Sequence, residues 1–338
     1  MSKEVYYGDY LQLDKILGAQ LPESDLAKVE AHDEMLFIIT HQAYELWFKQ
    51  ILHEIDSIKA IFGKNQINDN DPDLSTVVHR MKRVIKILEL AVNQISIMET
   101  MTPLDFLDFR DLLRPASGFQ SYQFKFIEAS LGLKLNDRHG KEYYLSHLRQ
   151  NHIEAVQEIE SQPSIIEAVN AWLERMPFIK DENASEINIP EYWKAYITAY
   201  DNTLVDGEKE NTKRFKELLF NPEFTKDRRL SNKANRSALF IMLYRDYPLL
   251  QAPYQLLNCL LEIDEQMATW RYRHMNMVHR MIGTRVGTGG SSGKNYLKAA
   301  LDKHYIFQEI AELTSFLVER RKIPVLPADL EDRLRFNR

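Results

Sequence analysis

The sequence predicts an all-α protein built as a single large domain. Apolar residues recur every three or four positions through most of the 338 residues, which is the spacing of one helix face. We find no convincing strand pattern of alternating apolar and polar residues, and no internal repeat. Because 44% of the residues are hydrophobic, the chain can bury a sizeable core. We expect an N-terminal arm over residues 1–20 and a helical domain over 21–338.

The individual helices are predicted from these patterns and from signals at their ends. Ser24 resembles a helix start and Gly63 a natural stop, which predicts a first long helix over 24–62. Thr102 and Pro103 are typical of an N-cap followed by the first helical position, and predict a short helix. Further helices are expected over 74–99, 119–131, 141–159, 164–175, 190–219, 234–246, 253–282 and 295–320, with surface loops at 180–189 and 227–233.

Charge and cysteine content exclude several functional classes. The net charge is −6 and the pI about 6.0, so no basic field favours nucleic acid or an anionic membrane. Cys259 is the only cysteine, which excludes an intramolecular disulfide and any cysteine-rich zinc or iron–sulfur site. The N-terminus lacks the apolar run of a signal peptide, and no apolar stretch reaches about 18 residues. We therefore expect a soluble, cytoplasmic protein.

A glycine-rich segment, VGTGGSSGKN at 286–295, suggests a loop whose backbone N–H groups bind an anion. It departs from a P-loop because Thr288 stands where glycine is required, Asn295 replaces the Ser or Thr, and a helix precedes it. The dinucleotide fingerprint fails at Ser292, where its third glycine is required. A flexible connector between helices remains the alternative.

His274 lies on an apolar stripe whose spacing alternates between four and three residues. The stripe comprises Leu256, Leu260, Ile263, Met267, Trp270, His274, Met277 and Met281. A single histidine there is more often a satisfied core residue than a metal ligand. His279 lies about 140° around the helix from His274, so the two histidines do not share a metal ion.

A second histidine, His41, lies on a stripe of the same kind. The stripe comprises Phe37, His41, Tyr44, Phe48, Ile51 and Ile55. Nearby His32 and Glu34 imitate part of an iron facial triad, but they would lie about 200° apart on a helix. No HExxH zinc motif is present.

Arg110 and Phe106 are four residues apart and face the same way on the short helix that begins at Pro103. An arginine beside an aromatic ring suits a bidentate contact with a carboxylate. A surface ion pair with a neighbouring aspartate is the alternative, and this segment alone favours it. Taken with the two histidines and the glycine loop, the residues predict a pocket. With no thiolate available, histidine is the expected axial ligand if the cofactor is haem.

Five segments resemble the tryptophan 2,3-dioxygenase family, in the right order and over nearly the whole chain. They are YGDYLQLDKIL at 7–17, HDEMLFIITHQAYELWFKQILHE at 32–54, DFRDLLRPASGFQS at 108–121, LSNKANRSALFIMLYRDYPLLQAPYQLL at 230–257 and WRYRHMNMVHRMIGTRVGTGGSSG at 270–293. Residues 177–227 match the family less closely. Arg114 stands where the family is expected to have serine, a change that we expect to lie at the surface.

The resemblance implies an all-helical haem b enzyme that uses O2 to cleave the indole C2–C3 bond of L-tryptophan. The product would be N-formyl-L-kynurenine, in the first step of the kynurenine pathway, and the assembly a homotetramer built as a dimer of dimers. The implied site residues are His274 as the haem-iron ligand, His41 beside the indole nitrogen, Phe37 and Phe106 against the ring, Arg110 and Thr288 at the carboxylate and ammonium groups, and Tyr7, Tyr10 and Leu11 reaching a neighbouring subunit's site.

In this reading the anion bound by the glycine loop is an amino-acid carboxylate, and we expect the loop to close over substrate. Three rival functions remain open. They are a relative that inserts one oxygen atom into an aromatic ring, a haem-based sensor, and a helical scaffold without cofactor.

Overall fold

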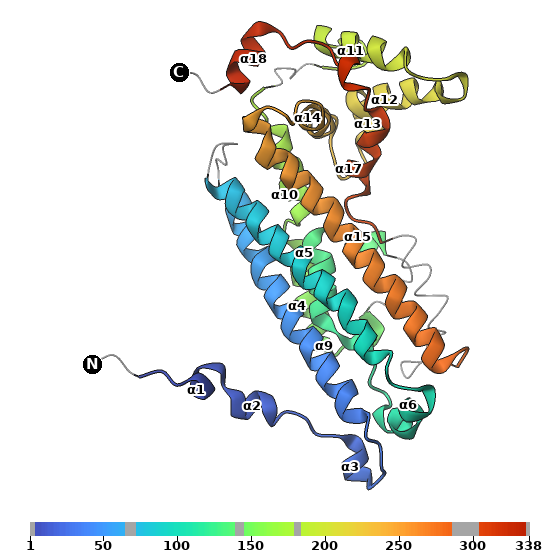
Figure 1. The fold of residues 1–338 in the computed structure, drawn as a ribbon. Coiled ribbons are helices and arrows are strands. Elements are labelled where there is room, and N and C mark those ends of the chain that lie inside the picture. The colour runs from blue at the N-terminus through green and yellow to red at the C-terminus, as the bar shows by residue number, and fades with distance from the viewer. Residues whose placement is uncertain (1–3, 65–71, 139–144, 179–183, 286–303, 336–338) are drawn as a thin grey trace.

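The computed structural model describes residues 4–64, 72–138, 145–178, 184–285 and 304–335, and within these ranges it contains helices and no strand. Three long helices form the body of the molecule (Figure 1). They are α4 (Glu34–Phe62), α5 (Pro72–Met98) and α15 (Pro248–Ile282). Helix α5 packs against both α4 and α15, and these two run antiparallel to each other. The all-α prediction is confirmed.

Shorter helices surround this body. At its lower end in Figure 1 lie α3 (Glu23–Ala27) and α6 (Pro103–Arg110). The other α-helices are α7 (Tyr122–Leu131), α9 (Gln150–Ser161), α10 (Ile165–Glu174), α11 (Glu191–Asp201), α12 (Glu210–Phe220), α13 (Pro222–Thr225), α14 (Asn232–Leu243), α17 (Gln308–Glu312) and α18 (Ala328–Leu334). The 3-10 turns span Asp111–Leu113, Gly118–Gln120, Leu135–Asp137, Asp206–Glu208, Leu313–Phe316 and Arg320–Lys322.

The first predicted long helix is wrong at its start. The chain leaves α3 through Lys28, which has φ 57°, and α4 begins only at Glu34. The cause is the buried Glu34 carboxylate, which accepts hydrogen bonds from the backbone N–H groups of Glu23 and Ser24 at 2.9 Å each. A continuous helix would hold Glu34 far from these groups, so the chain turns back to satisfy them.

The predicted helix over 190–219 is also interrupted, between α11 and α12. Thr212 donates its hydroxyl proton to the Asp201 side chain at 2.8 Å, and the Lys209 ammonium donates to the Asp201 carbonyl at 2.8 Å. These contacts fold α12 back on the end of α11 and require a turn between them.

The prediction of one helix over 295–320 fails in its described part, which begins at 304. The Asp264 carboxylate accepts from the backbone N–H groups of Ile306 and Phe307, and the Tyr196 hydroxyl donates to the Phe316 carbonyl at 2.8 Å. Side chains from other helices therefore satisfy backbone groups that a continuous helix would use internally.

Other boundaries shift by smaller amounts. Helix α9 begins at Gln150, where a start near 141 was predicted, and residues 139–144 lie outside the described ranges. Helix α7 begins at Tyr122, after a 3-10 turn. Helix α15 begins at Pro248, where the first turn needs no backbone N–H donor, and it contains Pro253 in its interior.

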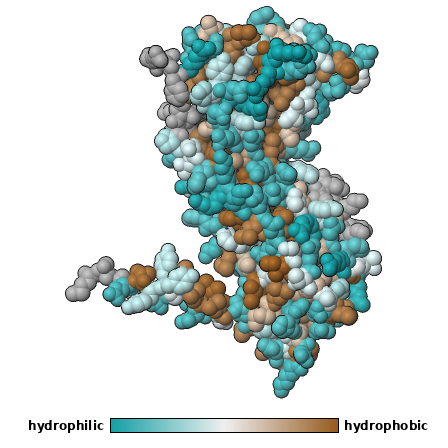
Figure 2. All heavy atoms as spheres, viewed as in Figure 1, coloured by the Kyte–Doolittle hydropathy of each residue, from teal (hydrophilic) through white to brown (hydrophobic). Residues whose placement is uncertain are grey.

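An arm formed by α1 (Tyr7–Leu11) and α2 (Leu13–Leu17) extends away from the bundle (Figure 1). Apolar side chains lie exposed along it (Figure 2), with Tyr7 75%, Tyr10 74% and Leu17 73% accessible. The described part of this chain therefore leaves these side chains of the arm uncovered. No helix of the described residues is long and apolar enough to span a bilayer.

A buried charge cluster links α7 to α15. The Glu128 carboxylate pairs with Arg138 at 2.5 Å and with Arg271 at 2.7 Å, and Arg271 also donates to the His304 carbonyl at 3.1 Å. Burial alone would raise the pKa of Glu128, but the two guanidinium groups outweigh it and hold that pKa well below its usual range. The carboxylate thus stays ionised and fixes α15 on α7.

We predict that Glu128→Gln lowers the free energy of unfolding by about 3–5 kcal/mol, because two buried guanidinium groups lose their carboxylate. Urea denaturation measures the change. Because the folded pKa of Glu128 is depressed, its contribution is fully present above the unfolded pKa, so the difference between variant and wild type should stay constant from pH 6 to 8.

The matched control is Glu89→Gln, which breaks a surface ion pair with Lys86 at 2.8 Å and should cost less than about 1 kcal/mol. Equal losses in the two variants would contradict a structural role for the buried cluster.

Candidate functional site

The two histidines on apolar stripes lie at the same level of the bundle. Tyr44 of α4 and Trp270 of α15 pack edge to face, with ring centroids 6.1 Å apart. His41 precedes Tyr44 by one turn and His274 follows Trp270 by one turn, and since the helices are antiparallel both lie on the same side of this contact. The positive charge of protonated His41 is close enough to lower the pKa of His274.

His274 is held as a neutral imidazole. Burial, and to a smaller extent the charge on His41, lowers the pKa of His274 to about 4. Its Nδ1 is sealed from solvent with no hydrogen-bond partner among the described residues, and the residue as a whole is half-buried. The other ring nitrogen is Nε2, and an unprotonated nitrogen of a neutral imidazole can bind a metal ion.

His41 is oriented by its own helix. Its Nδ1 lies 2.7 Å from the Phe37 carbonyl oxygen, and because a carbonyl only accepts, Nδ1 carries the proton. His41 is exposed at the surface. The protein that surrounds the rest of its ring nevertheless removes enough water to lower the pKa of His41. The Phe37 carbonyl and Glu45 only partly oppose this effect. A neutral ring with Nδ1 protonated leaves Nε2 as a hydrogen-bond acceptor.

Arg110 ends α6, whose position is fixed by a capping box. Asp105 N donates to the Thr102 hydroxyl at 3.3 Å, and Thr102 N donates to the Asp105 carboxylate at 2.8 Å. Arg110 is 4% exposed, and it forms an ion pair with Asp111 at 3.7 Å. The ion pair with a neighbouring aspartate, which was the alternative, is therefore present, although the guanidinium group is buried and only Asp111 is exposed.

An apolar cluster joins these elements at the lower end of the bundle. Phe37 packs against His41 with centroids 4.1 Å apart, against Phe106 at 5.8 Å and against Phe109 at 5.5 Å. The cluster also contains Met98, Met101, Met277 and Met281, with Ala31, Leu36, Leu113 and Ile282 at its edge. Residues of α4, α6 and α15 thus form one aromatic and sulfur-rich wall, which suits a flat apolar ligand.

The structure brings together five of the predicted site residues and leaves three apart. His41, His274, Phe37, Phe106 and Arg110 lie at this end of the bundle. The arm residues Tyr7 and Tyr10 are exposed and Leu11 is half-buried, and they do not join the cluster of their own chain. Thr288 and the glycine loop from 286 onward lie outside the described residues.

Three further residues shape the site and were not assigned a role from the sequence. Trp270 stacks on His274, Phe124 packs against Trp270 with centroids 4.9 Å apart, and Phe109 is fully buried beside Arg110. Trp270 carried a signal, since it occupies the stripe position one turn before His274. Phe124 carried none, because its contact crosses between helices far apart in sequence.

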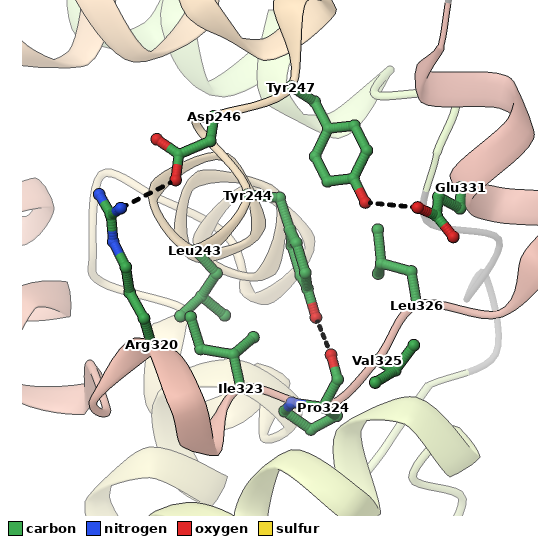
Figure 3. A pocket seen from close by; sticks show the side chains of 10 residues that line it. All are labelled: Leu243, Tyr244, Asp246, Tyr247, Arg320, Ile323, Pro324, Val325, Leu326 and Glu331. Carbon is green, nitrogen blue, oxygen red and sulfur yellow. Dashed lines mark hydrogen bonds and ion pairs between the residues drawn. The ribbon is translucent and has the colours of Figure 1, made fainter.

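A separate pocket of about 240 Å³ lies at the opposite end of the molecule, between α14 and the C-terminal segment (Figure 3). Its polar groups are paired with one another. Asp246 pairs with Arg320 at 3.2 Å, and the Tyr247 hydroxyl donates to Glu331 at 3.2 Å. It contains none of the predicted site residues, and its polar groups are committed to one another, so we do not assign it a ligand.

Comparison with known proteins gives a consistent result. A family profile described as tryptophan 2,3-dioxygenase matches residues 1–227 and 216–317. Similar proteins include tryptophan 2,3-dioxygenases of Bdellovibrio bacteriovorus, 43% identical over 98% of this chain and 98% of the relative, and of Alteromonas mediterranea, 44% identical over 98% and 97%. The rat tryptophan 2,3-dioxygenase is 41% identical over 94% of this chain and 83% of its own.

We predict that the apoprotein loses stability at acid pH because His274 is held neutral. Its folded pKa of about 4 lies below the unfolded value of 6.5, so between these values the unfolded chain binds the proton first. Stability should therefore fall as the pH drops from 6.5 towards 4, and less steeply in His274→Gln. Denaturant titrations at pH 7.5 and pH 5 measure this, and equal losses in the two proteins would show that His274 is not held neutral.

Proposed function

Because the chain belongs to the tryptophan 2,3-dioxygenase family, we propose that it cleaves the indole C2–C3 bond of L-tryptophan with O2 to give N-formyl-L-kynurenine, the first step of the kynurenine pathway. One observation carries the proposal. His41 and His274 lie at one level on antiparallel helices, and the apolar wall that begins beside His41 leads to a buried arginine. This arrangement suits an amino acid with an aromatic side chain.

The residues of this site fit a haem b group. His274 offers a neutral nitrogen, and the surrounding wall is aromatic and apolar, as a macrocycle requires. The described residues contain no cluster of three His, Cys, Asp or Glu side chains that could hold a metal ion. A single histidine ligand suits an ion whose other ligands come from a porphyrin. When bound, haem supplies the activation of dioxygen, and the protein supplies orientation and electrostatics.

Arg110 provides the charge that selects an amino acid. Its buried guanidinium group would bind the substrate carboxylate, while Phe37 and Phe106 pack against the indole ring. A buried arginine without its carboxylate is costly, so indole and tryptamine should bind poorly although they fit the apolar wall. Thr288 remains the predicted partner of the ammonium group.

His41 would accept a hydrogen bond from the indole N–H through Nε2. The carbonyl of Phe37 holds the proton on Nδ1, and the lowered pKa keeps the ring neutral, so Nε2 is an acceptor near neutral pH. Full removal of the indole proton is unfavourable, because imidazole is too weak a base for so weak an acid. His41 therefore orients the indole ring and does not remove its N–H proton.

We propose that the protein is a homotetramer assembled as a dimer of dimers, as the family resemblance implies, and the exposed arm supports contact with a neighbouring subunit. Tyr7, Tyr10 and Leu11 would enter a neighbouring subunit's site and close it against water. Glu34 contributes by fixing α3, the root of this arm, on the start of α4.

The direct test of the activity is a spectrum of the reduced protein with L-tryptophan and air. A Soret band together with growing N-formylkynurenine absorbance is expected. A product that keeps its indole ring and gains one oxygen would favour the single-oxygen alternative, and a colourless protein would favour the scaffold.

We predict that Arg110→Ala raises the KM for L-tryptophan roughly 10- to 150-fold, the loss expected for a hydrogen bond between charged groups. Steady-state kinetics measure it, with L-tryptophanamide binding as the comparison because this analogue lacks the carboxylate charge. An unchanged KM would remove Arg110 from the carboxylate role.

We predict that His41→Ala keeps its haem and loses only about tenfold in kcat, because a neutral hydrogen bond is worth about 1 kcal/mol. A loss of 10²–10⁴, the range of general base catalysis, would instead show that His41 removes the proton. Haem content by absorbance and single-turnover rates separate the two outcomes.

A further inference from the structure

Trp270 and His274 form a nearly parallel pair. Their ring centroids are 5.0 Å apart and their planes differ by 4°. The two residues are one turn apart on α15, so the stack forms within a single helix and does not depend on how helices pack. The indole ring therefore covers one face of the imidazole.

The imidazole lacks the restraint that usually orients a metal-binding histidine. Such a ligand normally donates its second ring N–H to a carboxylate, a carbonyl or water, which fixes the ring's rotation and its tautomer. Nδ1 of His274 is sealed from solvent, and no acceptor lies within reach of it among the described residues. Without another contact the ring would be free to rotate about its Cβ–Cγ bond.

Trp270 is itself held on several sides. Phe124 of α7 packs on it with centroids 4.9 Å apart, and Tyr44 of α4 meets it edge to face at 6.1 Å. Tyr44 is fixed in turn by its hydroxyl, which donates to the Ala91 carbonyl of α5 at 2.9 Å. The residue after Trp270 is Arg271, which is paired with the buried Glu128. Trp270 thus connects the orientation of His274 to four helices.

We propose that Trp270 is a positioning residue that holds the His274 ring by stacking in the orientation that binds haem iron through Nε2. This inference rests on the proposed haem function.

Two substitutions separate stacking from simple packing. Trp270→Phe keeps an aromatic face over the imidazole, whereas Trp270→Leu keeps an apolar side chain but removes the face. The control is Trp193→Leu in α11, where a fully buried tryptophan is lost far from His274. Each protein is examined as purified holoenzyme, by resonance Raman spectroscopy of the ferrous iron–histidine stretch and by the rate of haem transfer to a globin scavenger.

Wild type and Trp270→Phe should show one narrow stretching band in the range of neutral imidazole. Trp270→Leu should broaden or shift the band and release haem roughly 2- to 10-fold faster, the equivalent of one aromatic pair. Trp193→Leu should lose stability to denaturant while keeping the wild-type band and haem transfer rate.

An unchanged band and transfer rate in Trp270→Leu would overturn the inference. The proposed function has its own test in His274→Ala. If that variant keeps a normal Soret band, the haem ligand is another residue and the proposed function itself fails. If His274→Ala loses haem while Trp270→Leu behaves as wild type, only the role of Trp270 is wrong.

Discussion

The edge-to-face contact between Tyr44 and Trp270 is the constraint on which the site depends. Together with the packing of both α4 and α15 on α5, it sets the relative heights of His41 and His274. A slide of α15 by the rise of one residue would move His274 about 1.5 Å along the helix axis, and the residue brought to its former height would point about 100° away. The ion pair between Glu128 and Arg271 opposes the same slide from the α7 side, at the residue next to Trp270.

Burial gives both imidazoles of the site one defined protonation state. They stay neutral because desolvation lowers their pKa values, and the Arg110 guanidinium group lies buried at the same end of the bundle. Neutral nitrogens suit a metal ion and an indole N–H, and the guanidinium group suits a carboxylate. An amino acid with an indole side chain matches all three requirements.

Features that lie within one helix could be predicted from the sequence. Stripes with four-and-three spacing placed His41 one turn from Tyr44 and His274 one turn from Trp270, although His41 is exposed, and Thr102 marked the start of α6. The break before Glu34 and the irregular chain at 304–307 were missed. There, carboxylates from Glu34 and Asp264 take backbone N–H groups distant in sequence, and no local pattern encodes such contacts.

A crystal structure of the ferrous protein with L-tryptophan tests most directly whether His274 and His41 serve one substrate site. We predict that His274 Nε2 binds the iron and that the indole nitrogen lies within hydrogen-bond distance of His41 Nε2. The substrate carboxylate should contact Arg110. Iron bound by another residue, or tryptophan bound only in the pocket between α14 and the C-terminal segment, would contradict this prediction.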